Sequence, residues 1–173
     1  RICLVGSEMC IRDSERTGTH MADGYARASN QPGVIIAGQN GPGATNLVTG
    51  LAQAKAAFSP VIALAGLYST KDKMEDAFQG LDQQSLFEPV TKKTITLKNS
   101  KNIPNAISDV FNVAMSPRRG PVCINLPRNL LAEKNNYKIN EKIKSFKNTN
   151  NTQSKPDTIK RAAKLISLSL IHI

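Results

Sequence analysis

The 173-residue sequence lacks several features that mark common classes of protein. No apolar run approaches the roughly eighteen residues of a membrane-spanning helix, so we predict no membrane segment. No Walker-type loop, metal-spaced Cys/His cluster or serine-nucleophile elbow occurs, and we predict no metal site formed by this chain. Of its three cysteines, only Cys123 lies outside residues 1–14, and its apolar neighbours favour a small buried side chain. One such cysteine supports no disulfide framework and fits a cytoplasmic protein.

Both ends of the sequence look foreign to the rest of the chain. Residues 1–14 and about 167–173 resemble peptides that arise when adaptor sequence is translated in assembled reads. A natural terminus is the alternative interpretation. We therefore exclude both segments from the fold prediction and expect the chain to be a piece of a longer reading frame.

The formal charge of +10 is unevenly distributed along the chain. Residues 15–97 hold seven basic and seven acidic side chains, whereas residues 98–173 hold fourteen basic and four acidic ones. A nucleic-acid surface within residues 134–164 is one interpretation. A solvated linker is favoured, because the lysines are scattered through an Asn-rich stretch with few aromatic side chains. We predict no nucleic-acid partner.

Hydrophobic patterning predicts helices that alternate with short apolar strands. The predicted helices cover residues 15–28, 44–58, 82–88 and 103–115, and the predicted strands cover residues 34–37, 60–65, 94–97 and 122–126. Continuous apolar strands are typical of a sheet that is buried on both faces. The alternation predicts an α/β fold with a doubly wound, mostly parallel sheet and helices on both faces.

The composition divides the chain into segments. Residues 15–132 form the predicted domain, and residues 133–156, rich in Lys, Asn, Ser and Thr, are a predicted disordered linker. An amphipathic helix is predicted at residues 157–166, at the start of a further domain assigned to residues 157–173.

The most informative motif is a glycine-rich turn between a predicted strand and a predicted helix. It reads Gly41-Pro42-Gly43-Ala44-Thr45-Asn46. Glycine lets a ligand approach the backbone, and the first turn of a helix offers N–H groups beside it. An ordinary strand–helix connection is the alternative. The turn therefore indicates a binding site only in combination with the neighbouring motifs of the chain.

Those neighbours are Glu15-Arg-Thr-Gly-Thr-His20-Met-Ala-Asp-Gly-Tyr-Ala-Arg27, Ala77-Phe78-Gln79, Val90-Thr91-Lys92 and Gly120-Pro121-Val122. In this order and spacing, the five motifs resemble the N-terminal pyrimidine-binding domain of thiamine-diphosphate enzymes. The resemblance is strongest to the acetolactate synthase group and covers residues 15–131.

The resemblance implies roles for residues near the cofactor. Glu15 would be catalytic, because a glutamate at this spacing shares a proton with N1′ of the aminopyrimidine; a solvated helix-start residue is the alternative. Gly41, Pro42, Gly43 and Asn46 would line the same pocket.

Phe78 and Gln79 match a family pair beside the reacting carbons, contributed to the cofactor of a partner subunit. Gln79 would be catalytic and donate a hydrogen bond to the substrate, and Phe78 would line the substrate pocket. A core aromatic is the alternative for Phe78. Three departures put specificity in doubt: Gly80 replaces a glutamate, Gly66-Leu-Tyr-Ser69 replaces a Gly-Gln-Val-Pro run, and Gln39-Asn40 looks more like sulfoacetaldehyde acetyltransferase.

Other charged residues receive ordinary structural interpretations. Asp23 and Arg27 lie four residues apart on one helix and predict a surface ion pair. Arg118 and Arg119 are expected to cap the carboxyl end of helix 103–115. Lys92 is expected to pair with a carboxylate or to be solvated.

The implied full-length protein is an enzyme that decarboxylates pyruvate and adds the product to a second 2-oxo acid. The resemblance implies thiamine diphosphate and Mg²⁺, the metal held by a later domain with a Gly-Asp-Gly motif absent here, and FAD in a middle domain. It also implies a cytoplasmic homodimer or tetramer active in branched-chain amino acid biosynthesis. Sulfoacetaldehyde acetyltransferase, glyoxylate carboligase and 2-oxo acid decarboxylase chemistry stay open. A noncatalytic standalone subunit is the alternative of another class. We expect these 173 residues alone to bind the cofactor poorly and to show no turnover.

Overall fold

The computed structural model describes residues 14–38, 40–137 and 155–168. The chain divides into two units, Arg1–Lys142 and Ile143–Ile173, which are described separately. The predicted head at residues 1–14, the linker at residues 133–156 and the tail at residues 167–173 fall largely outside the described residues, so their boundaries stay predictions.

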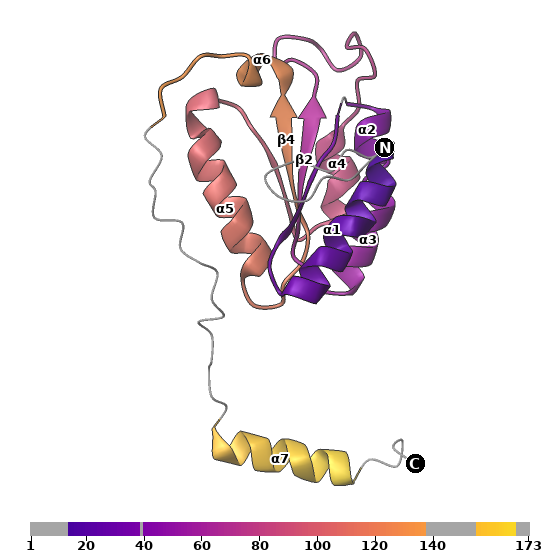
Figure 1. Cartoon of the computed structure of the whole chain (residues 1–173), viewed down its shortest axis with the longest axis vertical. Helices are drawn as coiled ribbons and strands as arrows, with labels where there is room; N and C mark the ends of the chain where they lie inside the picture. Colours follow the sequence, from indigo (N-terminus) through magenta and orange to yellow (C-terminus); the bar gives the residue numbers. More distant parts are fainter. Residues whose placement is uncertain (1–13, 39, 138–154, 169–173) are drawn as a thin grey trace. The chain divides into compact units, whose positions relative to one another are not determined.

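The first unit is an α/β domain built around a four-stranded parallel sheet (Figure 1). Its elements are α1 (Glu15–Ser29), β1 (Gly33–Ile36), α2 (Pro42–Thr45), α3 (Val48–Ala56), β2 (Val61–Leu67), α4 (Gln83–Phe87), η1 (Glu88–Val90), β3 (Lys93–Thr96), η2 (Ser100–Asn102), α5 (Ile103–Met115), β4 (Val122–Pro127) and α6 (Arg128–Leu131). The strand order is β1-β2-β4-β3, and every neighbouring pair is parallel. The predicted fold class is confirmed.

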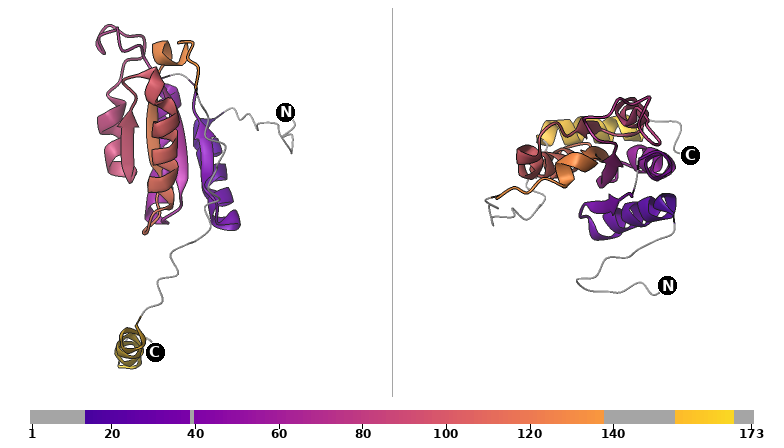
Figure 2. Two further views of the ribbon diagram at one scale, coloured as in Figure 1. Left: turned by 90° about the vertical axis from the view of Figure 1, so that its left-hand side faces the viewer. Right: turned by 90° about the horizontal axis from the view of Figure 1, so that it is seen from above.

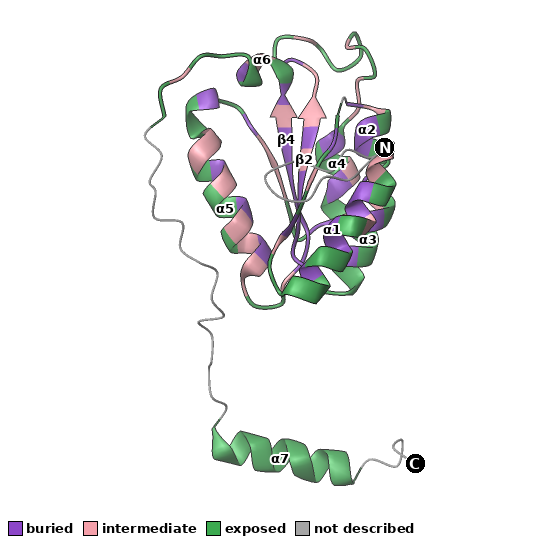
Figure 3. Cartoon of the chain, viewed as in Figure 1, coloured by how far each residue is buried: buried purple, intermediate pink, exposed green. Residues whose placement is uncertain are grey.

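Helices cover both faces of the sheet because side chains alternate along the central strands. On β2, Val61 and Ala63 face a core that α1, α3 and α4 complete, whereas Ile62 faces a core that α5 completes. Figure 3 shows the buried colour concentrated on β2, β4 and the sheet-facing sides of the helices. Burial on both faces is confirmed for the central strands β2 and β4, as the sequence predicts. It is wrong for the edge strand β1, where Val34 is 47% and Ile36 56% exposed.

Helix α1 ends where the sequence places a turn. Asn30 has a left-handed backbone with φ 60°, and its N–H donates to the carbonyl of Ala26. Asparagine adopts this left-handed conformation at the end of a helix more readily than most other residues do. The predicted helix at residues 15–28 is confirmed to within one residue.

One predicted helix is divided in two. The segment predicted as residues 44–58 forms α2 and α3, separated by a turn at Asn46 and Leu47. The Leu47 N–H donates to Ala44 three residues earlier, at 3.1 Å, which tightens the backbone at this point. Periodicity does not reveal the break because small and apolar side chains continue through it.

The short helix α6 was not predicted. Its four residues directly follow β4 and are too few to carry a helical period. Together with the loop after β2, α6 lies at the end of the sheet where β2 and β4 finish, as Figures 1 and 2 both show. The helix thereby adds Arg128 and Asn129 to the edge where a ligand would bind.

The predicted cap of α5 is corrected. Lys92, rather than Arg118, reaches the carboxyl end of α5, where its Nζ donates to the carbonyl of Val113 at 2.8 Å and to Ser116. Arg118 instead stacks over the Phe58 ring at 5.0 Å, and Arg119 donates to the Asn30 side chain. The Lys92 side chain extends to α5 from the loop before β3. Sequence rules for helix capping consider only residues near the helix end, so they do not predict this tertiary contact.

Residues 133–137, at the start of the predicted linker, contact the domain. Tyr137 donates its hydroxyl proton to the carbonyl of Ser100 at 2.9 Å, and Asn135 donates to the Ser100 hydroxyl at 3.0 Å. The second unit contains α7 (Pro156–Ser167), whose residues are all exposed. None of the helices in the described ranges is long and apolar enough to cross a membrane.

Candidate functional site

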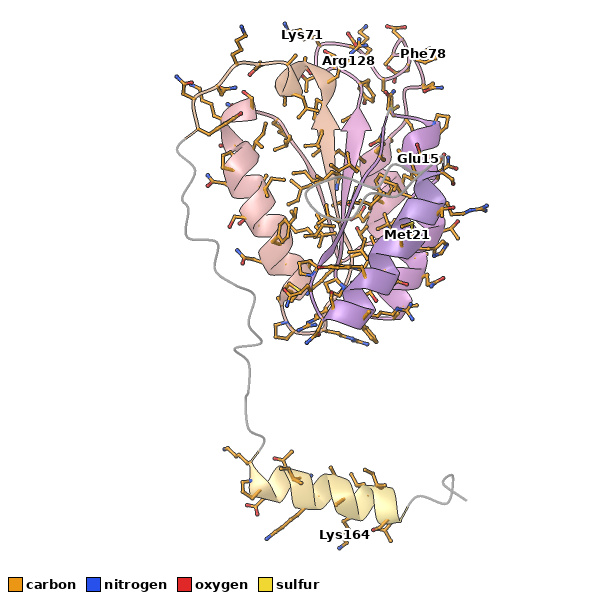
Figure 4. All side chains as sticks on the ribbon, viewed as in Figure 1. Glu15, Met21, Lys71, Phe78, Arg128 and Lys164 are labelled. Carbon is orange, nitrogen blue, oxygen red and sulfur yellow. The ribbon has the colours of Figure 1, made fainter. Side chains whose placement is uncertain are left out.

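The candidate site lies at the carboxyl edge of the parallel sheet. Helix α2, the loop after β2 and α6 gather at this end of the domain in Figures 1 and 2. In parallel α/β sheets, ligands characteristically bind outside the carboxyl ends of the strands. The residues selected from the sequence lie in elements that meet here, and Figure 4 shows Glu15 and Phe78 toward this end.

Glu15, Gly43 and Asn46 come together at the start of two helices. Glu15 is the first residue of α1, half-buried, and Asn46 follows α2. The Asn46 Nδ2 donates to Glu15 Oε2 at 3.1 Å. A Cβ built on Gly43 would lie 3.6 Å from Glu15 Oε1, so the bare Gly43 backbone faces the second carboxylate oxygen. The amide orients the carboxylate, and glycine keeps the space beside Oε1 open.

Gly41 and Gln79 form a second close contact. Gly41 has φ 70° and ψ −116°, a conformation that other residues rarely adopt. A Cβ at this position would lie 2.7 Å from the Cβ of Gln79 and 3.3 Å from its Oε1. The Gln79 side chain therefore lies directly over the glycine turn, and no larger residue fits at position 41.

Asn40 links the glycine turn to the Phe78–Gln79 segment. Its side chain is only 7% exposed, and Nδ2 donates to the carbonyls of Phe78 at 2.8 Å and Gln79 at 3.0 Å. Phe78 itself is 73% exposed, so the alternative of a core aromatic is wrong. The exposed ring fits a residue whose partner is a ligand or another chain rather than this domain.

A cleft of about 220 Å³ lies between these segments, with Gly38, Asn40, Gly66, Tyr68, Phe78 and Arg128 among its lining residues. Across it, Arg128 Nη2 pairs with Asp72 Oδ2 at 2.9 Å. Beside this pair, the Asn129 side chain accepts from Thr70 N–H and donates to Thr70 Oγ1, both at 2.9 Å. These bonds attach the loop after β2 to α6.

The predicted site residues thus fall into two contact groups joined by one turn. Glu15, Gly43 and Asn46 form the first, and Gly41 and Gln79 form the second, with Phe78 beside Gln79. Pro42 is the exposed first residue of α2, where its missing N–H costs no helical bond. Within the described ranges, no cluster of three or more His, Cys, Asp or Glu side chains is placed to hold a metal.

The expected ion pair is present, but its two side chains differ in exposure: Arg27 is 49% exposed, whereas Asp23 is buried within a larger network. The Asp23 side chain is 3% exposed and accepts two hydrogen bonds from Arg27, at 2.7 and 3.0 Å. Gln53 Nε2 of α3 donates to Asp23 at 3.1 Å. Burial by itself raises the pKa of Asp23, but these bonds, one from Ser59 and the Arg27 charge hold it below its ordinary value. Spacing identified the pair but not its burial beneath α3.

Sequence reasoning missed the residues that organise the site from outside it. The sequence marks Asn40 only as a departure from the family pattern, and it assigns no role to Asp72, Arg128 or Asn129. The proximity of Asn40 to the glycine turn was an available signal. No local signal connects Asp72 with Arg128, because 56 positions separate them.

Comparisons with known proteins place the chain among thiamine diphosphate enzymes. The sequence model described as "Thiamine pyrophosphate enzyme, N-terminal TPP binding domain" matches residues 6–86. That match begins inside residues 1–14, and the proposed boundary at residue 14 stays a prediction. Among solved structures, a putative thiamin diphosphate-dependent enzyme from Mycobacterium smegmatis superposes with a TM-score of 0.64 at 26% identity, over 68% of this chain and 23% of that one.

Two curated relatives are named as acetolactate synthases or their large subunit. A probable acetolactate synthase large subunit from Methanocaldococcus jannaschii is 43% identical over 158 residues, which cover 90% of this chain and 27% of the relative. An acetolactate synthase from Bacillus subtilis is 35% identical over 133 residues, which cover 77% of this chain and 23% of the relative. The chain spans about a quarter of the length of these relatives.

Proposed function

The chain belongs to the thiamine pyrophosphate enzymes through their N-terminal TPP binding domain, and we propose that it supplies the aminopyrimidine half of the cofactor site in an acetolactate synthase-type enzyme. The observation that carries this proposal is the contact of Glu15 with Asn46 beside Gly43. The names of the relatives favour acetolactate synthase over the other chemistries of the superfamily.

The residues present fit an aminopyrimidine ring. Such a ring offers nitrogen acceptors, an amino group and flat faces, and the turn offers a carboxyl group, an amide and glycine backbone. Space that a Cβ at Gly43 would fill lies directly beside Glu15 Oε1. Thiamine diphosphate, when bound, supplies the electron sink that decarboxylation of a 2-oxo acid requires.

Glu15 is proposed to hold and move one proton at Oε1. The Asn46 amide occupies Oε2, which fixes the carboxyl group and directs its other oxygen toward the open side of Gly43. A carboxyl group positioned within hydrogen-bond reach of a ring nitrogen is the geometry that proton transfer needs.

Gln79 and Phe78 are proposed to bind the 2-oxo acid. The Gln79 amide lies over Gly41, next to the turn on which the ring would sit, and can donate to a substrate carbonyl or carboxylate. The exposed Phe78 ring lines the adjoining cleft and would exclude water from the reacting carbons.

The remaining parts of the activity belong to a longer protein and are proposals about it. Mg²⁺ and the diphosphate would be held by a later domain, and FAD by a middle domain that begins near α7. A homodimer or tetramer would place this domain against the partner's diphosphate domain, in the cytoplasm. Sedimentation of the longer protein, with and without thiamine diphosphate and Mg²⁺, tests this assembly.

The direct test is binding of an aminopyrimidine to the 173-residue chain. In NMR titration with 4-amino-5-hydroxymethyl-2-methylpyrimidine, we expect weak binding that shifts the amide signals of Gly41, Gly43 and Asn46. Glu15→Gln should weaken this binding about tenfold, because the amide cannot give or take the proton. Glu88→Gln, at an exposed position of η1, is the matched control and should leave it unchanged.

Two results would contradict the proposal. One is an absence of shifts at the glycine turn at millimolar ligand, and the other is equal binding by Glu15→Gln and the unsubstituted chain. Acetolactate formation from pyruvate by the 173-residue chain alone would contradict the separate expectation that it shows no turnover.

A further inference from the structure

We propose that Asn40 is a positioning residue, whose side-chain amide holds the Phe78–Gln79 segment on the glycine turn and thereby orients Gln79 toward the substrate. This inference rests on the proposed function, because Gln79 acquires its role there. Nothing in the family resemblance assigns a role to Asn40, since this position is one where the sequence departs from the acetolactate synthase pattern.

The first argument is the chemistry of the contact. Asn40 Nδ2 donates to two successive carbonyls, those of Phe78 at 2.8 Å and Gln79 at 3.0 Å. Because both partners are acceptors, only a side chain with two donor hydrogens satisfies both. Aspartate has the same shape but places an acceptor against two acceptors. The Asn40 side chain is buried, so solvent does not replace the lost bonds.

The second argument is the backbone conformation that the amide holds. Gln79 has φ 55°, a left-handed conformation that is unfavourable for residues other than glycine, asparagine and aspartate. Such a conformation persists only where surrounding contacts fix it. The two bonds from Asn40 act on the carbonyls on either side of the Gln79 Cα, and are therefore placed to fix it.

The third argument is the path of the loop around Gln79. The Gly80 N–H donates to the carbonyl of Ala77 at 2.8 Å, which closes a tight turn. A Cβ at Gly80 would lie 1.9 Å from the carbonyl oxygen of Met74, so this turn requires glycine. The glycine that departs from the family pattern and the Asn40 amide thus serve the same local conformation.

The loop after β2 is attached at two separate places. Asn129 and Arg128 hold its start at Thr70 and Asp72, on the side of α6. Asn40 holds its end, on the side of the glycine turn. Loss of Asn40 should therefore free Phe78 and Gln79 while the start of the loop stays in place.

The test uses the 173-residue chain with Asn40→Asp, and with Asn40→Ser as an uncharged second variant. We expect the amide hydrogen of Gly80, which donates to Ala77, to exchange about tenfold faster or more in both variants, with β2 and α5 unchanged. Asn105→Asp makes the same chemical change at an exposed position of α5 and should alter none of these rates. In the unsubstituted chain, the Asn40 amide should show through-hydrogen-bond coupling to the carbonyls of Phe78 and Gln79.

Titration with the same hydroxymethylpyrimidine separates positioning from general damage. In Asn40→Asp, the ligand should still shift Asn46, beside Glu15, but should no longer shift the Gln79 side-chain amide. A merely structural role would reduce both responses or neither.

Each outcome decides one question. Unchanged exchange at Gly80, or missing coupling in the unsubstituted chain, overturns the inference whatever the ligand does. Faster exchange with an unchanged Gln79 response to the ligand overturns the positioning role. If the unsubstituted chain binds no pyrimidine, the proposed function fails, and exchange and coupling alone decide whether Asn40 holds the segment.

Discussion

The two faces of the sheet are packed with side chains of different size. The face covered by α1 and α3, here called the site face, is rich in small side chains such as Ala22, Ala54 and Ala63. The face covered by α5, here called the support face, is packed with larger ones such as Ile62 and Ile124. Every residue predicted from the sequence to bind the cofactor lies on segments attached to the site face.

The difference shows how packing produces a site. A Cβ at Gly50 of α3 would lie 2.6 Å from the Thr19 side chain of α1, so the two helices approach closely only because glycine is present. This approach brings Glu15, at the start of α1, within 3.1 Å of Asn46. Large side chains on the support face fix the sheet, and small ones on the site face set the distances between functional groups.

The largest effect on stability is expected on the support face. Ile124→Ala removes a fully buried side chain between β4 and α5 and should lower the free energy of unfolding by about 3 kcal/mol. Ile159→Ala, on exposed α7, is the matched control and should change it by less than about 0.5 kcal/mol. Urea denaturation measures both. Below the unfolding transition, pyrimidine binding should be unchanged; parallel loss of binding would show that the faces are not independent.

The site face should be the face that is sensitive to acid. Because the pKa of Asp23 is lowered in the folded chain, its ionised form stabilises folding above the ordinary pKa near 3.8, and this contribution disappears as the pH falls through the lower folded pKa. Asp23→Asn should lower the free energy of unfolding by about 2 kcal/mol at pH 7, because the charged hydrogen bonds from Arg27 are lost. It should also flatten the dependence of stability on pH below 5.

Asp109→Asn is the control for that comparison, because Asp109 is exposed on α5 of the support face. Urea denaturation at a series of pH values between 3 and 7 measures both variants. An unchanged pH dependence in Asp23→Asn would assign the acid sensitivity to other carboxylates rather than to Asp23.

Much of this fold was predictable because its signals are local. The strand at residues 122–126 is a continuous apolar run, and the helix at residues 103–115 has helical spacing; the structure contains β4 and α5 at these positions. The break after α2 was not predictable, because the tight Leu47 bond leaves no mark on periodicity. Nor was α6, whose four residues are shorter than one informative period.

The candidate site was predictable as a set of residues but not as an arrangement. Motif spacing selected Glu15, Asn46 and Gln79, and the contact between Glu15 and Asn46 agrees with that selection. The Asn40 amide donates hydrogen bonds to the carbonyls of residues that lie 38 and 39 positions later in the sequence. No local sequence pattern indicates such a contact. Contacts of this kind depend on where β1 and β2 lie in the sheet, which only the folded chain specifies.

Gly41 provides the sharpest test of the site face. Gly41→Ala introduces a Cβ 2.7 Å from the Cβ of Gln79 and forces alanine to φ 70°. We therefore expect the free energy of unfolding to fall by about 1–2 kcal/mol and pyrimidine binding to be lost. Gly24→Ala, in α1, meets nothing within 4 Å and should raise stability by about 0.5–1 kcal/mol. Opposite signs in urea denaturation are the expected result. Normal binding by Gly41→Ala would contradict a ligand site at this turn.

The smallest effect is expected where the two faces meet, at the end of the sheet opposite the site. Arg118, after α5, stacks on Phe58, after α3, at 5.0 Å, and Arg118 itself has φ 56°. Arg118→Ala loses the cation–π contact but keeps the unfavourable backbone conformation. Loss of the contact should lower the free energy of unfolding by about 0.5 kcal/mol. Arg118→Gly loses the same contact but removes the strain, so its stability should equal or exceed that of the unsubstituted chain. If both variants lose the same amount, the backbone at this position is not strained, and the loss is that of the contact with Phe58.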